Sequence, residues 1–130
     1  MSDNLFLNRI ISLTPYSSAR GEYRALSEEV LLDANENPWG EFNRYPDPQQ
    51  LRLKQVLGEL WRVSPEMIIL GNGSDEVIDL IMRATCRPGE DSVLIFAPTY
   101  GMYKVVAAIN GVQIREQLLD ESFQLPRYQH

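Results

Sequence analysis

Hydrophobic residues recur at helical spacing soon after residue 47. Five of them share one face of a helix, at positions i, i+3, i+4, i+7 and i+8: Leu53, Val56, Leu57, Leu60 and Trp61. Asp47 is a good N-cap residue and Pro48 suits the first helical position, so we expect the helix to begin there. The segment Ser64–Glu66 contains a proline and is expected to end it.

Three short apolar runs and two further helical patterns alternate after this helix. The runs at 67–70, 92–96 and 112–118 predict buried strands. The patterns at 74–85 and 100–109 predict helices, the first with four residues facing inward: Val77, Ile78, Ile81 and Ala84. The order strand, helix, strand, helix, strand predicts an α/β fold with a mostly parallel sheet and right-handed crossovers.

The first 46 residues have a different pattern. Apolar residues near the start predict one short helix that needs a partner surface: Leu5, Phe6, Leu7, Ile10, Ile11 and Leu13. Turn residues then dominate, so we expect an irregular N-terminal arm over residues 1–46 and an α/β domain over residues 47–130. Parallel sheets need helices on both faces, and the predicted helices barely cover three strands. We therefore expect an incomplete sheet, the first part of a larger domain.

Composition narrows the class of protein. The chain has 130 residues, of which 44% are hydrophobic and 23% charged, as in ordinary globular proteins. Its net charge of −6 repels phosphate backbones, so no nucleic-acid partner is expected. The single cysteine, Cys86, cannot form an intrachain disulfide and suggests a reducing compartment, which we take to be the cytoplasm. No apolar run reaches the roughly 18 residues of a membrane helix, so no membrane partner is expected.

Residue counts also exclude several chemistries. The only histidine is the terminal His130, so neither a Ser-His-Asp triad nor a multi-histidine metal site is expected. The segment that starts at Asp33 begins like a calcium loop, but Pro38 stands where the loop needs glycine and Arg44 where it needs glutamate. We therefore expect no metal site.

The segment Gly71–Glu76 follows a predicted strand and opens a predicted helix. Its glycines allow a sharp turn, and the free N–H groups at the start of the helix attract an anion. Glu76 stands where the dinucleotide fingerprint needs a small residue, and no lysine follows as in a P-loop. These residues fit a phosphate site, but a turn in which Asp75 and Glu76 merely complement the helix dipole is the better interpretation of the spacing taken alone.

Tyr100 follows the second predicted strand at its carboxyl end. Ligands of open α/β sheets bind at that edge, which the Gly73 turn shares. An aromatic side chain there can stack on a planar ring. Alternatively, Tyr100 and Tyr103 simply pack a helix, which is the better interpretation of these residues taken alone.

Five segments, in this order, resemble the histidinol-phosphate aminotransferase family: LTPYSSAR, LDANENP, NRYPDP, GNGSDE and APTYGMY. The resemblance runs from about Leu13 to Leu125. It implies a partial large domain of a fold-type-I transferase that depends on pyridoxal 5'-phosphate (PLP). The activity it implies is amino transfer between glutamate and imidazole-acetol phosphate in histidine biosynthesis, by a cytoplasmic homodimer.

The resemblance also implies roles for individual residues. Ser74 and Asp75 would bind the PLP phosphate at the helix N-terminus, and Tyr100 would stack on the pyridine ring. Tyr45 would reach across the dimer interface to the cofactor phosphate of the other subunit. Tyr16 and Asn35 would lie near the phosphorylated amino-acid or keto substrate.

No catalytic residue is assigned, because the family's Schiff-base lysine lies downstream of the matched stretch. The two lysines, Lys54 and Lys104, occupy other places in the pattern and are expected on solvated faces. We expect a truncated N-terminal portion that is inactive alone and binds PLP weakly or not at all. Two alternatives stay open: a fragment of a related PLP enzyme, such as an aromatic aminotransferase or threonine-phosphate decarboxylase, and a non-catalytic dimerising remnant.

Overall fold

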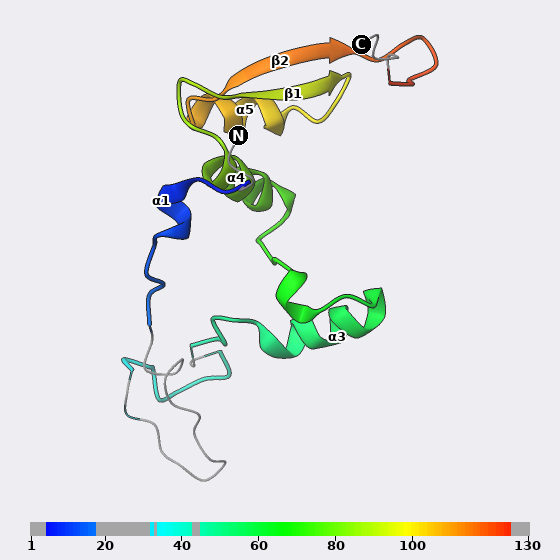
Figure 1. Ribbon diagram of the computed structural model, residues 1–130. Helices are drawn as coiled ribbons and strands as arrows, with labels where there is room; N and C mark the ends of the chain where they lie inside the picture. The colour runs from blue at the N-terminus through cyan, green and yellow to red at the C-terminus, as the bar shows by residue number, and fades with distance from the viewer. Residues whose placement is uncertain (1–4, 18–31, 33, 43–44, 126–130) are drawn as a thin grey trace. The chain divides into compact units, whose positions relative to one another are not determined.

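The computed structural model describes residues 5–17, 32, 34–42 and 45–125 (Figure 1). The chain divides into two compact units, one made of Met1–Leu13 with Ile69–His130 and the other of Thr14–Ile68. Each unit is described by itself. In the part of the chain that the structure describes, no helix combines the length and the apolar character needed to cross a membrane.

The first unit contains a two-stranded parallel sheet. Strand β1 (Ser92–Ala97) lies beside β2 (Gln113–Leu118), with Ser92 opposite Gln113 and Ala97 opposite Leu118. Helix α5 (Met102–Ile109) connects the two strands, and α4 (Ser74–Thr85) precedes β1. The predicted parallel pairing and the α/β class are confirmed, and the predicted bounds of α4 are those observed.

The core of this unit lies where α4, α5 and the sheet meet (Figure 1). Its buried residues come from α4, from α5 and from the turn before β2: Met82, Val106, Ala107 and Val112. Partly buried side chains of both strands, Val93 and Ile114, pack against this cluster. Apolar packing therefore joins α5 to the sheet on one side and to α4 on the other.

The short helix predicted near the N-terminus is present as α1 (Asn8–Ile11). Hydrogen bonds attach it to the carboxyl end of α4, whereas Leu5, Phe6, Ile11 and Leu13 stay exposed, so the described residues do not provide the apolar surface that was expected. The N–H of Leu7 donates to the carbonyl oxygen of Ala84 at 2.9 Å, and the Arg9 guanidinium donates to the carbonyl oxygen of Arg83 at 3.2 Å. The first residues thus satisfy two carbonyl groups that a helix end leaves without intrahelical partners.

The predicted strand at 67–70 is wrong. A 3₁₀ turn (η1, Pro65–Met67) precedes residues that belong to no strand, although Ile68 is buried. A strand exists only through hydrogen bonds to a neighbouring strand, and in the described residues β1 pairs with β2 alone. The side chain of Ile68 is buried, but the backbone of residues 67–70 pairs with no strand in the described part of the chain.

The inward face of α4 also differs from the prediction in one residue. Ile81 is exposed, whereas its neighbour Met82 is buried against α5. The buried stripe follows Ile78 and Met82, which are four residues apart, and Ile81 lies about 100° around the helix from Met82. Val77 and Ala84 are half-buried, as expected of residues beside the stripe.

The second unit contains helix α3 (Leu51–Trp61), which begins later than predicted. The Asp47 carboxylate accepts hydrogen bonds from the N–H groups of Gln49 at 2.9 Å and Leu51 at 2.7 Å. These bonds hold a turn ahead of the helix, and Gln50 takes a left-handed conformation with φ of 48°. Asp47 therefore binds the first helical N–H from a position outside the helix.

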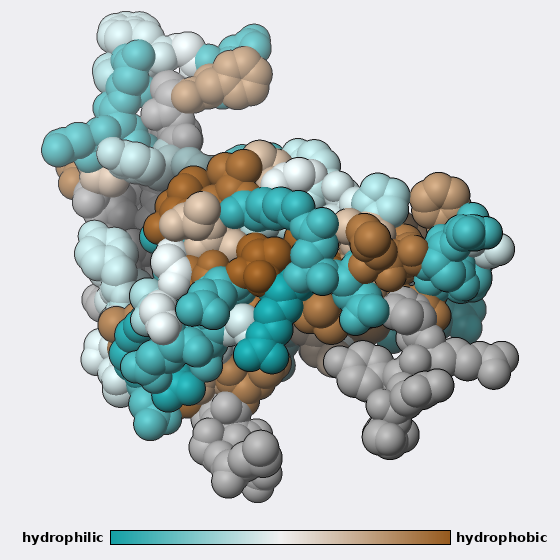
Figure 2. All heavy atoms as spheres, turned by 90° about the horizontal axis from the view of Figure 1, so that it is seen from above, coloured by the Kyte–Doolittle hydropathy of each residue, from teal (hydrophilic) through white to brown (hydrophobic). Residues whose placement is uncertain are grey.

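The predicted inward face of α3 is not buried by any part of the chain that the structure describes. Four of its apolar residues are exposed, namely Leu53, Val56, Leu60 and Trp61. Lys54, expected on a solvated face, is half-buried. Hydrophobic side chains also reach the surface in the space-filling view (Figure 2). The apolar pattern predicted the helix correctly, but most of its apolar face packs on nothing in the described residues.

Candidate functional site

The N-terminus of α4 is open to an incoming ligand. Gly73 precedes the helix with φ of +81°, and no atom lies within 4 Å of the place where a Cβ would stand. Helix α4 has 12 residues, and no described group accepts a hydrogen bond from the N–H of Ser74 or Asp75. Such N–H groups lie at the positive end of the helix dipole, so this turn can hold an anion.

The other side of the same turn is closed. A Cβ on Gly71 would lie 2.8 Å from Cγ2 of Val77, and the Glu76 carboxylate accepts a hydrogen bond from the N–H of Asn72. The backbone from Gly71 to Gly73 is therefore folded tightly over the first turn of α4. Of these two glycines, only Gly73 has open space beside it for a ligand.

Tyr100 lies beside this helix end. Its hydroxyl donates a hydrogen bond to Oδ2 of Asp75 at 3.3 Å, across 25 residues of sequence. This bond, with some desolvation and the negative charge of Asp75, raises the pKa of the Tyr100 phenol. Tyr103 meets Tyr100 edge to face, with ring centroids 6.3 Å apart and planes at 84°. Tyr103 packs on the core, whereas Tyr100 is exposed and makes the polar contact, so the two tyrosines differ in environment.

Asn35 and Tyr45 are brought together in the second unit. Both line a pocket of about 600 Å³, together with Asn37, Trp39, Gly40, Glu41 and Phe42. The N–H of Tyr45 donates to a carboxylate oxygen of Glu36 at 2.8 Å, which ties Tyr45 back to the LDANENP segment. Tyr16 belongs to the same unit, but its side chain is 93% exposed and it is not among the residues lining the pocket.

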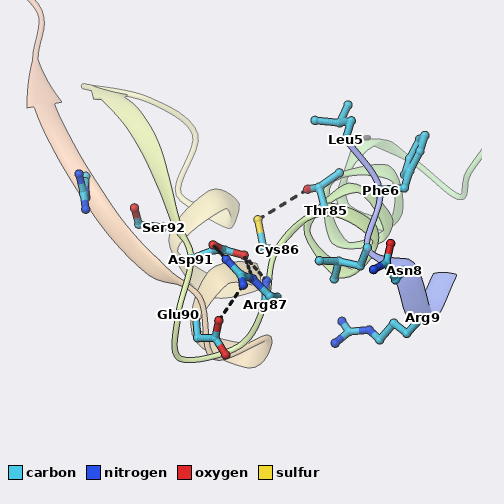
Figure 3. Close-up of a pocket in the computed structure, with 12 residues that line it drawn as sticks. Leu5, Phe6, Asn8, Arg9, Thr85, Cys86, Arg87, Glu90, Asp91 and Ser92 are labelled. Atoms are coloured by element: carbon cyan, nitrogen blue, oxygen red, sulfur yellow. Dashed lines mark hydrogen bonds and ion pairs between the residues drawn. The ribbon is translucent and has the colours of Figure 1, made fainter. Parts of the chain in front are cut away.

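A second pocket, of about 900 Å³, is lined in part by Ser92 at the start of β1 (Figure 3). Tyr100 follows the other end of that strand. Arg87 is held there by Glu90 at 2.9 Å and by Asp91 at 3.0 Å. The hydrogen bonds from the Arg87 side chain and backbone lower the pKa of Asp91 to about 2. None of the residues assigned from the sequence lines this pocket, so its size does not make it the cofactor site.

Comparison with known proteins places these features in a family. The sequence model named "Aminotransferase class I and II" matches residues 16–126. The chain belongs to the class I and II aminotransferase family.

Curated members resemble the chain closely over one part of their length. It is 56% identical over 116 residues to the histidinol-phosphate aminotransferase of Bacteroides thetaiotaomicron, covering 88% of this chain and 34% of that protein. It is 52% identical over 128 residues to the enzyme of the same name from Cytophaga hutchinsonii, covering 95% of this chain and 36% of that protein. The chain thus spans about a third of the length of the curated relatives it matches.

The residues at the end of α4 fit the phosphate-bearing cofactor that this aminotransferase family implies. The turn at Gly73 leaves open space in front of N–H groups that the described residues do not use. Oδ1 of Asp75 is buried without a hydrogen-bond partner in the described part of the chain. A carboxylate oxygen only accepts hydrogen bonds, so this atom needs a donor and is not satisfied by a phosphate; the fit to the cofactor rests on the open N–H groups beside Gly73.

Within its own unit, this aminotransferase chain offers no free lysine to that site. Nζ of Lys104 forms an ion pair with the Glu116 carboxylate, so Lys104 bridges α5 and β2. Lys54 belongs to α3, in the other unit. The structure therefore gives no reason to assign either lysine a catalytic role, and neither does the sequence.

Sequence reasoning missed one pair of polar residues at the contact between α4 and α5. Asn110 donates a hydrogen bond to Oδ1 of Asp79 at 2.7 Å, and Asp79 also receives a hydrogen bond from Arg83 at 2.7 Å. Only one sequence signal was available: Asp79 follows Asp75 by four residues and so shares its helix face. Glu36, which holds the backbone of Tyr45, was missed as well.

Proposed function

We propose that this chain forms the cofactor-phosphate site of a histidinol-phosphate aminotransferase. In the intact enzyme the reaction moves an amino group between glutamate and imidazole-acetol phosphate, with PLP as cofactor. The observation that carries the proposal is the contact of Tyr100 with Asp75 beside the open turn at Gly73. This contact supports the proposal because an aromatic ring and a helix N-terminus with open N–H groups lie together.

Different residues of this site would bind different parts of the cofactor. The N–H groups of Ser74 and Asp75 would bind its phosphate, and the Ser74 hydroxyl can add a donor. Tyr100, oriented by Asp75, would lie against its ring. When bound, PLP supplies an electron sink that stabilises negative charge at the substrate α-carbon.

The second unit would supply the substrate side of the enzyme. Asn35 and Tyr45 line one pocket of this unit, but the roles proposed for them lie in different subunits, so the pocket does not carry the assignment. In the proposed homodimer, the partner subunit's Tyr45 would approach the cofactor phosphate, and Tyr16 and Asn35 would approach the substrate. We place the enzyme in the cytoplasm, in keeping with its single cysteine.

Phosphate binding by the chain itself tests the cofactor site. Inorganic phosphate, and then PLP, are added to the ¹⁵N-labelled chain, and the amide shifts of Ser74 and Asp75 are followed. We expect saturable shifts that Gly73→Val abolishes, because valine is strained at φ of +81°. Gly89→Val is the matched control, since Gly89 has φ of +76° and similarly open surroundings but lies in another turn. Equal shifts in wild type and Gly73→Val would reject the site.

The activity is tested in a chimera. The chain replaces the matching N-terminal third of the Bacteroides thetaiotaomicron enzyme, and glutamate and imidazole-acetol phosphate are supplied as substrates. We expect turnover, a raised KM for the keto substrate in Asn35→Ala, and loss of PLP retention in Gly73→Val. A chimera that folds and binds PLP but does not turn over these substrates would contradict the proposed activity.

A further inference from the structure

Helices α4 and α5 share a polar contact that lies apart from the proposed cofactor site. One hydrogen of the Asn110 side-chain amide is donated to Oδ1 of Asp79 at 2.7 Å, and the amide also donates to the carbonyl oxygen of Val106 at 2.9 Å. Asn110 follows the last residue of α5, so the bond to Val106 caps that helix. The same side chain thus fixes the end of α5 and binds α4.

Asp79 is itself held in place. Its second oxygen, Oδ2, accepts a hydrogen bond from Nε of Arg83, one turn further along α4, at 2.7 Å. The hydrogen bond from Asn110, followed by that from Arg83, lowers the pKa of Asp79. Asp79 is therefore a fixed, ionised acceptor for Asn110, and the contact is charge-assisted and directional.

The position of Asp79 on α4 connects it to Tyr100. Asp75 and Asp79 are four residues apart on one helix face, beside the apolar stripe of Ile78 and Met82 that packs toward α5. Asp75 accepts from Tyr100, which precedes α5, and Asp79 accepts from Asn110, which follows it. Two consecutive turns of α4 are thus hydrogen-bonded to residues at the two ends of α5.

Apolar packing alone does not specify this alignment. The buried contact between the helices consists of Met82, Val106 and Ala107 with partly buried neighbours, and such burial is non-directional. A slide of α5 along α4 would keep apolar surface covered but would carry the Tyr100 hydroxyl away from Asp75. Polar contacts of fixed geometry select one alignment among several that bury similar area.

We propose that Asp79 and Asn110 are positioning residues that hold α4 and α5 in the alignment at which Tyr100 reaches Asp75. Neither residue touches the cofactor site, and both act through the orientation of the Tyr100 ring. The consequence for catalysis rests on the function proposed above, whereas the alignment itself does not.

The titration of Tyr100 tests the proposal without any ligand. The full chain is labelled with ¹³Cζ-tyrosine, and Tyr100→Phe identifies the resonance. In wild type we expect a pKa above the ordinary value of about 10. Asn110→Ala should bring it back toward that value, because the bond to Asp75 loosens. Asp79→Ala should do the same, whereas Asp79→Asn, which keeps an acceptor oxygen, should retain the wild-type pKa.

A core variant separates positioning from general destabilisation. Val112→Ala removes buried apolar volume from the same unit and should leave the Tyr100 pKa unchanged. A fall in Val112→Ala equal to that in Asn110→Ala would overturn the proposal, and so would an unchanged pKa in Asn110→Ala. If Asn110→Ala does not fold, Asn110→Ser, which is polar but shorter, is judged by the same criterion. Failure of both to fold while Val112→Ala folds would assign the pair to folding and overturn the positioning role.

Phosphate binding distinguishes this inference from the proposed function. Inorganic phosphate is titrated into wild type and Asn110→Ala, and the Ser74 amide is followed. We expect equal affinity in the two proteins, because the N–H groups belong to α4 itself, so a loss of affinity in Asn110→Ala would contradict a role limited to alignment. No binding by wild type would reject the cofactor site, and the Tyr100 titration would still decide the alignment.

Discussion

Tyr100 donates its hydroxyl to Asp75 at 3.3 Å, and this contact joins the carboxyl end of β1 to the N-terminus of α4. The donor follows a strand and the acceptor lies in the first turn of a helix, so the bond crosses the edge of the sheet at which α/β proteins bind ligands. Oδ2 of Asp75 accepts the bond from Tyr100, whereas Oδ1 of the same carboxylate is buried and has no hydrogen-bond partner among the described residues.

Removing the acceptor should lower the pKa of Tyr100. The hydrogen bond to Asp75 is the largest cause of the raised value, followed by desolvation, so Asp75→Ala should bring the phenol pKa down toward about 10. Glu76→Ala is the matched control, because Glu76 lies in the same turn but binds Asn72. The measurement is a ¹³Cζ-tyrosine titration between pH 8 and about pH 12. An unchanged pKa in Asp75→Ala would show that the two residues do not interact in solution.

The bonds around Tyr100 also show what sequence alone could supply. The glycines before residue 74 and the Pro-Gly turn after residue 87 bounded α4 correctly, because these signals are local. The same reasoning put Tyr100 and the Gly73 turn at one edge of the sheet. It could not provide the contact with Asp75, since 25 residues separate the two and only the packing of α5 on α4 brings them together.

The predictions that were wrong share a cause. The strand at 67–70 needed a neighbouring strand, and the apolar face of α3 needed a covering surface. Hydrophobic spacing records that a segment can be buried, but it carries no information on which surface buries it. Asp79 and Asn110 were missed for a similar reason, because each is an ordinary polar residue until the two helices are placed together.

Gly71 should tolerate a methyl group poorly. A Cβ there would lie 2.8 Å from Cγ2 of Val77, so Gly71→Ala must displace a side chain of α4 and should destabilise the protein by about 1–3 kcal/mol. Gly101→Ala is the control, because Gly101 has helical dihedral angles and open surroundings. Urea denaturation measures both, and we expect Gly101→Ala to be neutral or slightly stabilising. Equal stability of the two variants would show that the turn before α4 adapts.

The ion pair of Arg87 with Asp91 should give stability that depends on acid pH. The pKa of Asp91 is about 2 in the folded chain, below the ordinary value of about 3.9, so its contribution is present above about pH 4. That contribution is lost as the pH falls through about 2. Arg87→Gln should therefore be less stable than wild type at pH 5, and the difference should shrink toward pH 2. Glu90→Gln should leave the titration of Asp91 largely unchanged, and a difference that does not vary with pH would contradict the assignment.

Exposed apolar surface should make the chain associate. Among the described residues, the parallel sheet has two strands, so β1 and β2 each have an edge that pairs with no further strand, and parallel sheets are ordinarily covered on both faces. Apolar residues of α3 are exposed as well, among them Leu60 and Trp61. We expect sedimentation velocity to show an oligomer, or a rearranged dimer, that persists at high salt because the contact is apolar. A stable monomer at micromolar concentration would contradict this.

The chain alone should have no aminotransferase activity. The reaction needs a lysine at the cofactor that moves a proton at the substrate α-carbon, and Lys104 is instead paired with Glu116. The ion pair holds its ammonium group at β2. Lys54 lies on α3, outside the unit that contains the Gly73 turn.

The test of this prediction combines labelling with an activity assay. The chain is incubated with PLP, reduced with borohydride and digested, and the modified lysines are located by mass spectrometry. Turnover of glutamate and the keto-phosphate is measured in parallel. We expect low labelling, scattered over both lysines, and no turnover. Lys104→Arg should lose only the labelling at residue 104 and should still show no turnover, since it keeps the charge opposite Glu116 and removes one of the two lysine amines. Stoichiometric labelling of one lysine accompanied by turnover would show that this chain carries a complete catalytic site.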